Sequence, residues 1–201
     1  MKNKKNRIAA AIGGLMLCVS LSANAALESR LGGIAVYDTD LDITWLTDPT
    51  SGGLYTWEGA NAWVEGLSVH GLKGWRLPIS DNNCSGFNCI NSEFGHLFYT
   101  EFGVSPGSDI LSSNDPDKLL FSNLSYLNYW TGTLHDDNNA WVFNFRYGIQ
   151  FWDSIRTPLL KFTTAVHSGD IITMIPEPTT YAMLLAGLGL MGFLRKDLVK
   201  L

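Results

Sequence analysis

The chain has 201 residues, a length that favours one globular domain with accessory segments. Charged residues make up 16 % of it, and between Ala26 and Ile175 seven Lys and Arg face seventeen Asp and Glu, a formal net charge of −10. This acidic balance argues against nucleic acid as a partner and against an anionic polysaccharide held by charge alone, but it permits divalent cations.

The first 25 residues have the pattern of a secretory signal peptide. A basic stretch, 1–7, is followed by the apolar stretch 8–22 and then by Ala23-Asn24-Ala25, a small-x-small cleavage signature. We therefore expect cleavage after Ala25, with an uncleaved membrane anchor as the alternative. Leu17 precedes Cys18, where a lipobox needs a small residue, so lipidation is not expected.

The start of the remaining chain predicts two strands, 34–37 and 41–46, joined by a turn at 38–40. Asp38, Asp40 and Asp42 alternate as in a calcium loop. An EF-hand would need Gly and Glu where Ile43 and Pro49 stand, so a turn is the better interpretation.

Two helices are predicted next. Thr56 caps the first, 57–67, whose apolar face consists of Trp57, Ala60, Trp63, Val64 and Leu67. Asn91 or Ser92 caps the second, with an apolar stripe of Phe94, Leu97, Phe98 and Phe102. His96 lies off that stripe, so it is predicted to be solvated and not a ligand. Residues 103–118 are predicted to be a loop.

Between the helices stands the run Gly74-Trp75-Arg76-Leu77-Pro78. Trp75 and Leu77 share a parity and can face a core, whereas Arg76 points the other way and can bond carbonyls or a carboxylate. Pro78 ends the strand because it has no N–H to donate. A structural role is the main interpretation, and Arg76 as an anion ligand is the alternative.

Two cysteines, Cys84 and Cys89, remain after the signal peptide. In an oxidising compartment a lone pair at this spacing predicts a local disulfide that stiffens its loop. The spacing is not that of a C-x-x-C redox motif, and no His/Cys set completes a zinc site. No cofactor is predicted, and the sequence identifies no metal site. Calcium stays open, without a specific motif.

The second half is rich in strands, predicted at 129–134, 140–145, 149–152 and 162–167. A turn containing Asp136, Asp137, Asn138 and Asn139 separates the first two. Carbohydrate sites combine an exposed aromatic face with amides and carboxylates, so this turn with Trp141 and Trp152 forms the candidate ligand-binding set. The alternatives are core tryptophans and a solvated turn.

The chain ends in Pro176-Glu177-Pro178, an apolar run 181–194, and Arg195-Lys196. The run is long enough to approach the thickness of a bilayer and has no polar face. A buried terminal helix is the alternative to a transmembrane helix. This arrangement resembles a PEP-CTERM sorting signal, although its tail continues to Leu201. The resemblance implies recognition by an exosortase, transient anchoring in the inner membrane of a Gram-negative bacterium, and a final place at the cell surface or outside the cell.

The middle of the chain resembles the Lcl C-terminal-domain family. The resemblance covers about 37–170 and rests on the following segments: Thr44-Trp45-Leu46, Thr56-Trp57, Trp75-Arg76-Leu77-Pro78, Tyr129-Trp130-Thr131-Gly132-Thr133, Ala140-Trp141 with Phe145, and Ala165-Val166-His167-x-Gly169-Asp170. It implies an α+β, C-type-lectin-like fold with two helices and small twisted antiparallel sheets. His167 departs from the pattern, which usually has Arg there.

These observations predict three parts: a signal peptide, 1–25; a lectin-like domain, 26–175; and a sorting segment with a transmembrane helix, 176–201. No G-x-S-x-G, H-E-x-x-H or P-loop motif is present, and the expected function is non-enzymatic binding, with exopolysaccharide as the suggested ligand. The alternatives are a purely structural surface protein and a glycoside hydrolase, whose paired carboxylates the sequence does not single out.

Overall fold

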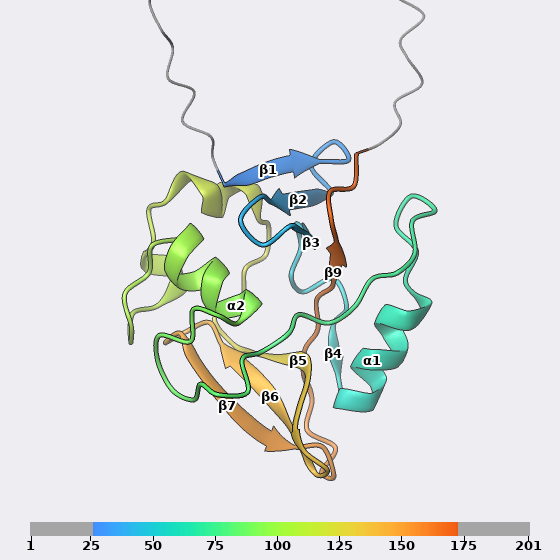
Figure 1. Cartoon of the computed structure of the whole chain (residues 1–201), viewed down its shortest axis with the longest axis vertical. Helices are drawn as coiled ribbons and strands as arrows, with labels where there is room; N and C mark the ends of the chain where they lie inside the picture. The colour runs from blue at the N-terminus through green and yellow to red at the C-terminus, as the bar shows by residue number, and fades with distance from the viewer. Residues whose placement is uncertain (1–25, 173–201) are drawn as a thin grey trace, which may run out of the picture.

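The computed structural model describes residues 26–172, which form two β-sheets with helices packed around them (Figure 1). Sheet A has the order β1-β2-β3-β9 and is antiparallel throughout. Its strands are β1 (Leu27–Arg30), β2 (Ala35–Asp38), β3 (Ile43–Leu46) and β9 (Val166–Ser168). The sequence predicted β2 and β3 to within about two residues, but it did not predict β1.

Sheet B has the order β4-β8-β5-β6-β7. Its strands are β4 (Leu54–Tyr55), β5 (Asn128–Asp136), β6 (Asn139–Asn144), β7 (Ile149–Ser154) and β8 (Lys161–Phe162). Its pairs are antiparallel except β5 and β8, which run parallel at Tyr129 and Phe162. The prediction of purely antiparallel sheets is therefore wrong at this one pair, although the α+β class is confirmed.

Both predicted helices are present. Helix α1 (Trp57–Gly66) begins at Thr56, whose side chain accepts the Gly59 N–H, and α2 (Glu93–His96) begins at Ser92, which accepts the Gly95 N–H. Helix α2 continues directly into a π-helical turn, η1 (Leu97–Glu101). The predicted loop that follows contains two short 3₁₀ helices, η2 (Ile110–Ser112) and η3 (Pro116–Leu120).

Helix α2 connects the two sheets through Phe94, which is buried. Its ring lies 5.5 Å from Trp45 of sheet A and 5.6 and 5.7 Å from Tyr129 and Phe143 of sheet B, between ring centroids. The whole predicted stripe of this helix is buried in the same apolar cluster. A second cluster places Ala60 and Val64 of α1 against Trp75, Trp130 and other side chains. The two clusters together form the core of the domain.

The single strand predicted at 162–167 is wrong, because the chain crosses here from one sheet to the other. Phe162 ends β8 in sheet B, and Val166 starts β9 in sheet A. Between them, Thr163 exchanges backbone hydrogen bonds with Gly52 and Gly53 of a loop, and the Ala165 carbonyl accepts the Leu46 N–H. A continuous run of β-forming residues thus contributes one strand to sheet B and the next strand to sheet A.

The Trp75–Pro78 segment forms only one bridge, between Arg76 and Val166, and not a full strand. The alternation of its side chains is nevertheless present, because Trp75 and Leu77 are buried and Arg76 points away from them. The Arg76 guanidinium donates to both carboxylate oxygens of Glu93, at 2.8 and 2.6 Å. Arg76 therefore fastens this segment to the start of α2.

Within residues 26–172 no helix combines the length and the apolar character needed to cross a membrane. The predicted signal peptide, 1–25, and the predicted transmembrane run, 181–194, lie outside the described residues. The two ends of the described region both lie beside sheet A, and the β5–β6 turn lies at the opposite end of the domain (Figure 1).

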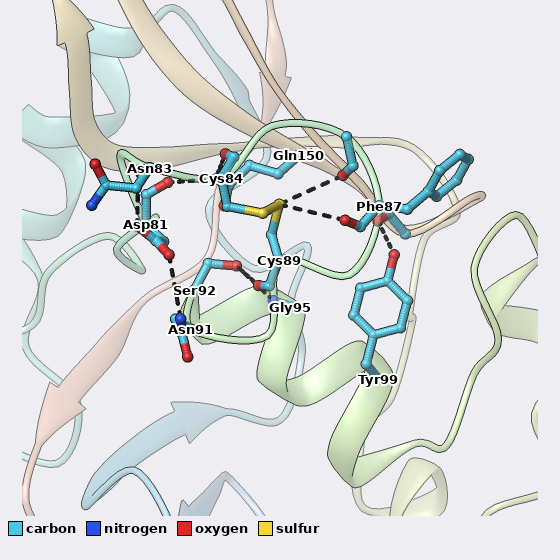
Figure 2. Close-up of a disulfide and its surroundings, with 12 residues drawn as sticks. Asp81, Asn83, Cys84, Phe87, Cys89, Asn91, Ser92, Gly95, Tyr99 and Gln150 are labelled. Carbon is cyan, nitrogen blue, oxygen red and sulfur yellow. Dashed lines mark hydrogen bonds between the residues drawn. A yellow bond between two sulfur atoms is a disulfide. The ribbon is translucent and has the colours of Figure 1, made fainter.

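The disulfide Cys84–Cys89 is present and closes a loop against the edge of sheet B (Figure 2). Gly86 in this loop exchanges two backbone hydrogen bonds with Gln150 of β7, at 2.7 and 2.9 Å. The buried Gln150 side chain donates to the carbonyls of Asp81 and Cys84. The loop is thus held both by the disulfide and by β7.

Replacing both Cys84 and Cys89 by serine is expected to lower the free energy of unfolding by about 2 kcal/mol or less, because the closed loop is short. Urea unfolding of the wild type and the double variant measures this difference. Amide hydrogen exchange at Gly86 should accelerate, while exchange in α1 should not. A loss of stability that spread to α1 would show that the disulfide supports the whole core and not its own loop.

Candidate functional site

The most exposed tryptophan among the described residues is Trp152 of β7, which is 50 % exposed. The imidazole of His135 stacks on its indole, with 5.2 Å between centroids and 3° between ring planes. His135 is the extra residue of a bulge in β5, between the paired positions Leu134 and Asp136. Because a bulge redirects a side chain, it accounts for the position of His135 over Trp152.

The turn beside these rings is fixed by its own side chains. The Asp136 carboxylate accepts the Asn138 backbone N–H at 2.8 Å and both of its oxygens accept the Asn139 side-chain amide, at 2.8 and 2.9 Å. These bonds, chiefly that from Asn139, hold the pKa of Asp136 below its ordinary value, so it stays ionised in mildly acidic conditions. Asp137 and Asn138 remain exposed at the tip of the turn.

The structure corrects the inclusion of Trp141 in the candidate ligand-binding set. It lies directly opposite Trp152 in the β6–β7 register, but only 2 % of it is exposed. Its indole N–H donates to Asn82 at 2.6 Å, and the His135 ring packs edge-on against it at 5.0 Å between centroids. A buried ring cannot stack on a ligand, so the role of Trp141 is to pack against His135 and not to contact a ligand.

Charged side chains surround this end of β7. Asp153 pairs with the buried Lys161 at 2.7 Å, and Arg156 donates to the Asn138 side chain at 2.8 Å. Lys161 therefore fixes the position of Asp153, and Arg156 fixes that of Asn138. We call Trp152, His135 and the turn 136–139 the distal face. It can offer an aromatic surface together with hydrogen-bonding groups on one side of it.

The residue that sequence reasoning misjudged most is His96. It was predicted to be solvated, but its side chain is 14 % exposed and its Nε2 lies 2.8 Å from Oε1 of Glu101. This hydrogen bond raises the pKa of His96, and burial raises the pKa of Asp38, which lies beside it. Asp38, His96 and Glu101 are the one group within residues 26–172 that can offer three metal-ligating atoms at close range.

A cavity of about 470 Å³ lies beside sheet A. Its lining includes Leu31, Val69, Leu72 and His167, and it extends to Ile172, the last described residue. His167 stands at the position where the resembled family has Arg. It packs edge-on against the aromatic ring of Trp75, at 5.6 Å between centroids.

Comparison with known proteins identifies the sorting signal. Residues 175–196 match the PEP-CTERM protein-sorting motif, which confirms the prediction made from Pro176-Glu177-Pro178 and the segment after it. No curated protein matches the chain. The motif implies that the protein is sorted by an exosortase to the outside of the cell, and it suggests export with transient membrane anchoring, as in Gram-negative bacteria.

Proposed function

We propose that the region 26–172 is a non-enzymatic binding module for a neutral extracellular polysaccharide, with the distal face as its contact surface. The proposal rests on one observation: the indole of Trp152 is exposed, and its orientation is fixed by the stacked ring of His135. The resemblance of 37–170 to the Lcl C-terminal domain, with its C-type-lectin-like fold, supports the same class of function. Export by way of the sorting motif is consistent with an extracellular ligand.

Stacking on a fixed aromatic ring is a suitable way to bind a sugar, because the C–H face of a pyranose is apolar and flat. A rigid aromatic side chain supplies contact area at a small cost in conformational entropy. Asp137 and Asn138 stand exposed next to the rings and can bond sugar hydroxyls. The surplus of acidic residues in this region disfavours an anionic chain, so a neutral polysaccharide is the better match.

The position of the distal face in the domain also favours ligand binding. The β5–β6 turn lies at the end of the domain opposite to the point where the described region ends, and the sorting motif follows at 175–196 in the sequence (Figure 1). A ligand at the distal face would therefore approach from the side away from the end of the described region.

The test is calorimetric titration of the exported protein with the extracellular polysaccharide of its producer, with calcium and with chelator. We expect saturable heat, and in Trp152→Ala a loss of affinity of about tenfold or more, which corresponds to about 1.4 kcal/mol. Tyr147→Ala is the matched control, because Tyr147 is also exposed but lies beyond the opposite end of β6 and β7. Calcium dependence would appear as heat only in its presence.

Two other results would support the alternatives. Wild-type protein that gives no heat with or without calcium indicates a purely structural surface protein, a role consistent with the use of the Asp136 carboxylate within its own turn. Release of reducing sugar from the polysaccharide, abolished by one carboxylate substitution, would indicate a glycoside hydrolase instead.

A further inference from the structure

Three side chains from two distant parts of the chain meet at the junction of sheet A and α2. Asp38 ends β2, while His96 ends α2 and Glu101 ends the π-helical turn η1. One ligating atom from each lies within 4.8 Å of the others. We call these three residues the Asp38 cluster. It belongs to a different part of the domain from the distal face and takes no part in the proposed polysaccharide binding.

The π-helical turn is what brings two of these residues together. His96 and Glu101 are five positions apart, which in an α-helix of 3.6 residues per turn would place them about 140° apart around the axis. In η1 the Phe102 N–H instead bonds the Leu97 carbonyl, five residues back, at 3.1 Å. This wider turn places Glu101 beneath His96. Single π-turns inserted in helices are frequent at functional sites.

The cluster is buried, and its charges do not balance. Asp38 is 0 % exposed and Glu101 6 %. Oδ1 of Asp38 accepts the N–H groups of Asp40 and Leu41, whereas the equally buried Oδ2 has no hydrogen-bond partner of normal geometry among the described residues. The nearby donor is the buried indole N–H of Trp45, which also lacks a well-formed bond and acts to lower the pKa of Asp38. A buried carboxylate oxygen without a hydrogen-bond partner destabilises the fold, and a bound cation would remove this cost.

The surroundings add more negative charge. Asp40 lies at the rim, with Oδ2 3.9 Å from Nε2 of His96. No Lys or Arg of the described region forms an ion pair with Asp38 or Glu101. With Asp38 ionised, as a metal ligand must be, even a protonated His96 would leave two buried carboxylates with one positive charge. A divalent cation would supply the missing charge and bond the free oxygen of Asp38.

We propose that Asp38, His96 and Glu101 bind one divalent first-row transition metal ion of the Zn²⁺ class, with Asp40 able to complete the ligand set. An imidazole nitrogen among carboxylate oxygens is a donor set suited to such ions, and it disfavours Ca²⁺, which takes oxygen ligands. The 2.8 Å between His96 Nε2 and Glu101 Oε1 is close to the roughly 3 Å expected between two ligands of one such ion. The ion would join β2 to α2 and serve a structural purpose.

The experiment uses exported protein stripped with a chelator and then titrated with Zn²⁺, followed by calorimetry and thermal unfolding. We expect one tightly bound ion per chain, and a folded-to-unfolded ratio raised about 100-fold when free Zn²⁺ is 100 times its Kd. Asp38→Asn and His96→Gln should each weaken binding at least about tenfold. His70→Gln, which changes an exposed histidine outside the cluster, should bind as the wild type does.

The outcomes separate a metal site from a purely internal ion pair. If His96 only pairs with Glu101, Zn²⁺ will not raise the melting temperature of the wild type, and Asp38→Asn will be more stable than the wild type in chelator because it removes an unpaired buried charge. That pair of results overturns the proposal, and so does wild-type Zn²⁺ affinity in folded Asp38→Asn. Should His96→Gln fail to fold, Asp40→Asn and the visible absorption of bound Co²⁺ test the same ligand set.

Discussion

Replacing Gly95 by alanine is expected to lower the free energy of unfolding by about 3 kcal/mol or more. A Cβ at this position would lie 1.9 Å from the Cys89 carbonyl oxygen and 2.7 Å from Oγ of Ser92. Both atoms are fixed, since the Cys89 carbonyl accepts from Ser92 and the Ser92 hydroxyl caps α2 by accepting the Gly95 N–H. The helix must move away from the disulfide loop, and His96, the next residue, must move with it.

Urea unfolding of Gly95→Ala beside Gly66→Ala checks this expectation. Gly66 ends α1 with nothing within 4 Å of its added Cβ and with an ordinary backbone conformation, so alanine there should raise stability by up to about 1 kcal/mol. Equal stability of the two variants would contradict the close approach of α2 to Cys89. The same displacement should weaken Zn²⁺ binding in Gly95→Ala, because His96 and Asp38 would no longer face each other.

The helices could be predicted from the sequence because their signals are local. Thr56 and Ser92 cap the helices as expected, and the stripe from Phe94 to Phe102 is buried in full. Caps and apolar periodicity depend on neighbours a few residues away, which any single sequence shows. The β5–β6 hairpin was located for the same reason, although β5 continues to Asp136 and β6 begins at Asn139, both of which were predicted to belong to the turn.

The pairing of distant strands could not be predicted in this way. The parallel contact between Tyr129 and Phe162, and the passage of the chain between sheets after Phe162, depend on partners far along the chain. Period-two alternation identifies a strand but not its sheet. It also failed to separate Trp141 from Trp152, because the burial of Trp141 depends on Asn82 and the loop that carries it.

The Asp38 cluster was missed for a more specific reason. Helical periodicity assumes 3.6 residues per turn, and on that assumption His96 lies away from both the apolar stripe and Glu101. The π-helical turn after His96 has more residues per turn than this assumption allows, and no local sequence pattern predicted it. The Asp38 turn itself was predicted, but its neighbour in space, 58 positions later, was not.

The second large effect is expected from Arg76→Met, which should lower the free energy of unfolding by about 3 kcal/mol. The Glu93 side chain is 8 % exposed and would lose both bonds from the guanidinium, keeping only the Ile79 N–H at 2.8 Å. A carboxylate left in this state is more costly than a neutral amide, which would still accept the Ile79 N–H. Arg76→Met combined with Glu93→Gln should therefore be more stable than Arg76→Met alone, by about 1 kcal/mol or more.

A double-mutant cycle by urea unfolding measures this coupling, and Arg30→Met is its matched control. Arg30 pairs with Glu28 and Asp170, both more exposed than Glu93, so its loss should cost only about 1 kcal/mol. Strictly additive effects of Arg76→Met and Glu93→Gln would mean that the pair contributes no more than a surface contact. Strong coupling would establish that the segment from Trp75 to Pro78 positions α2, and through it His96, by one partly buried ion pair.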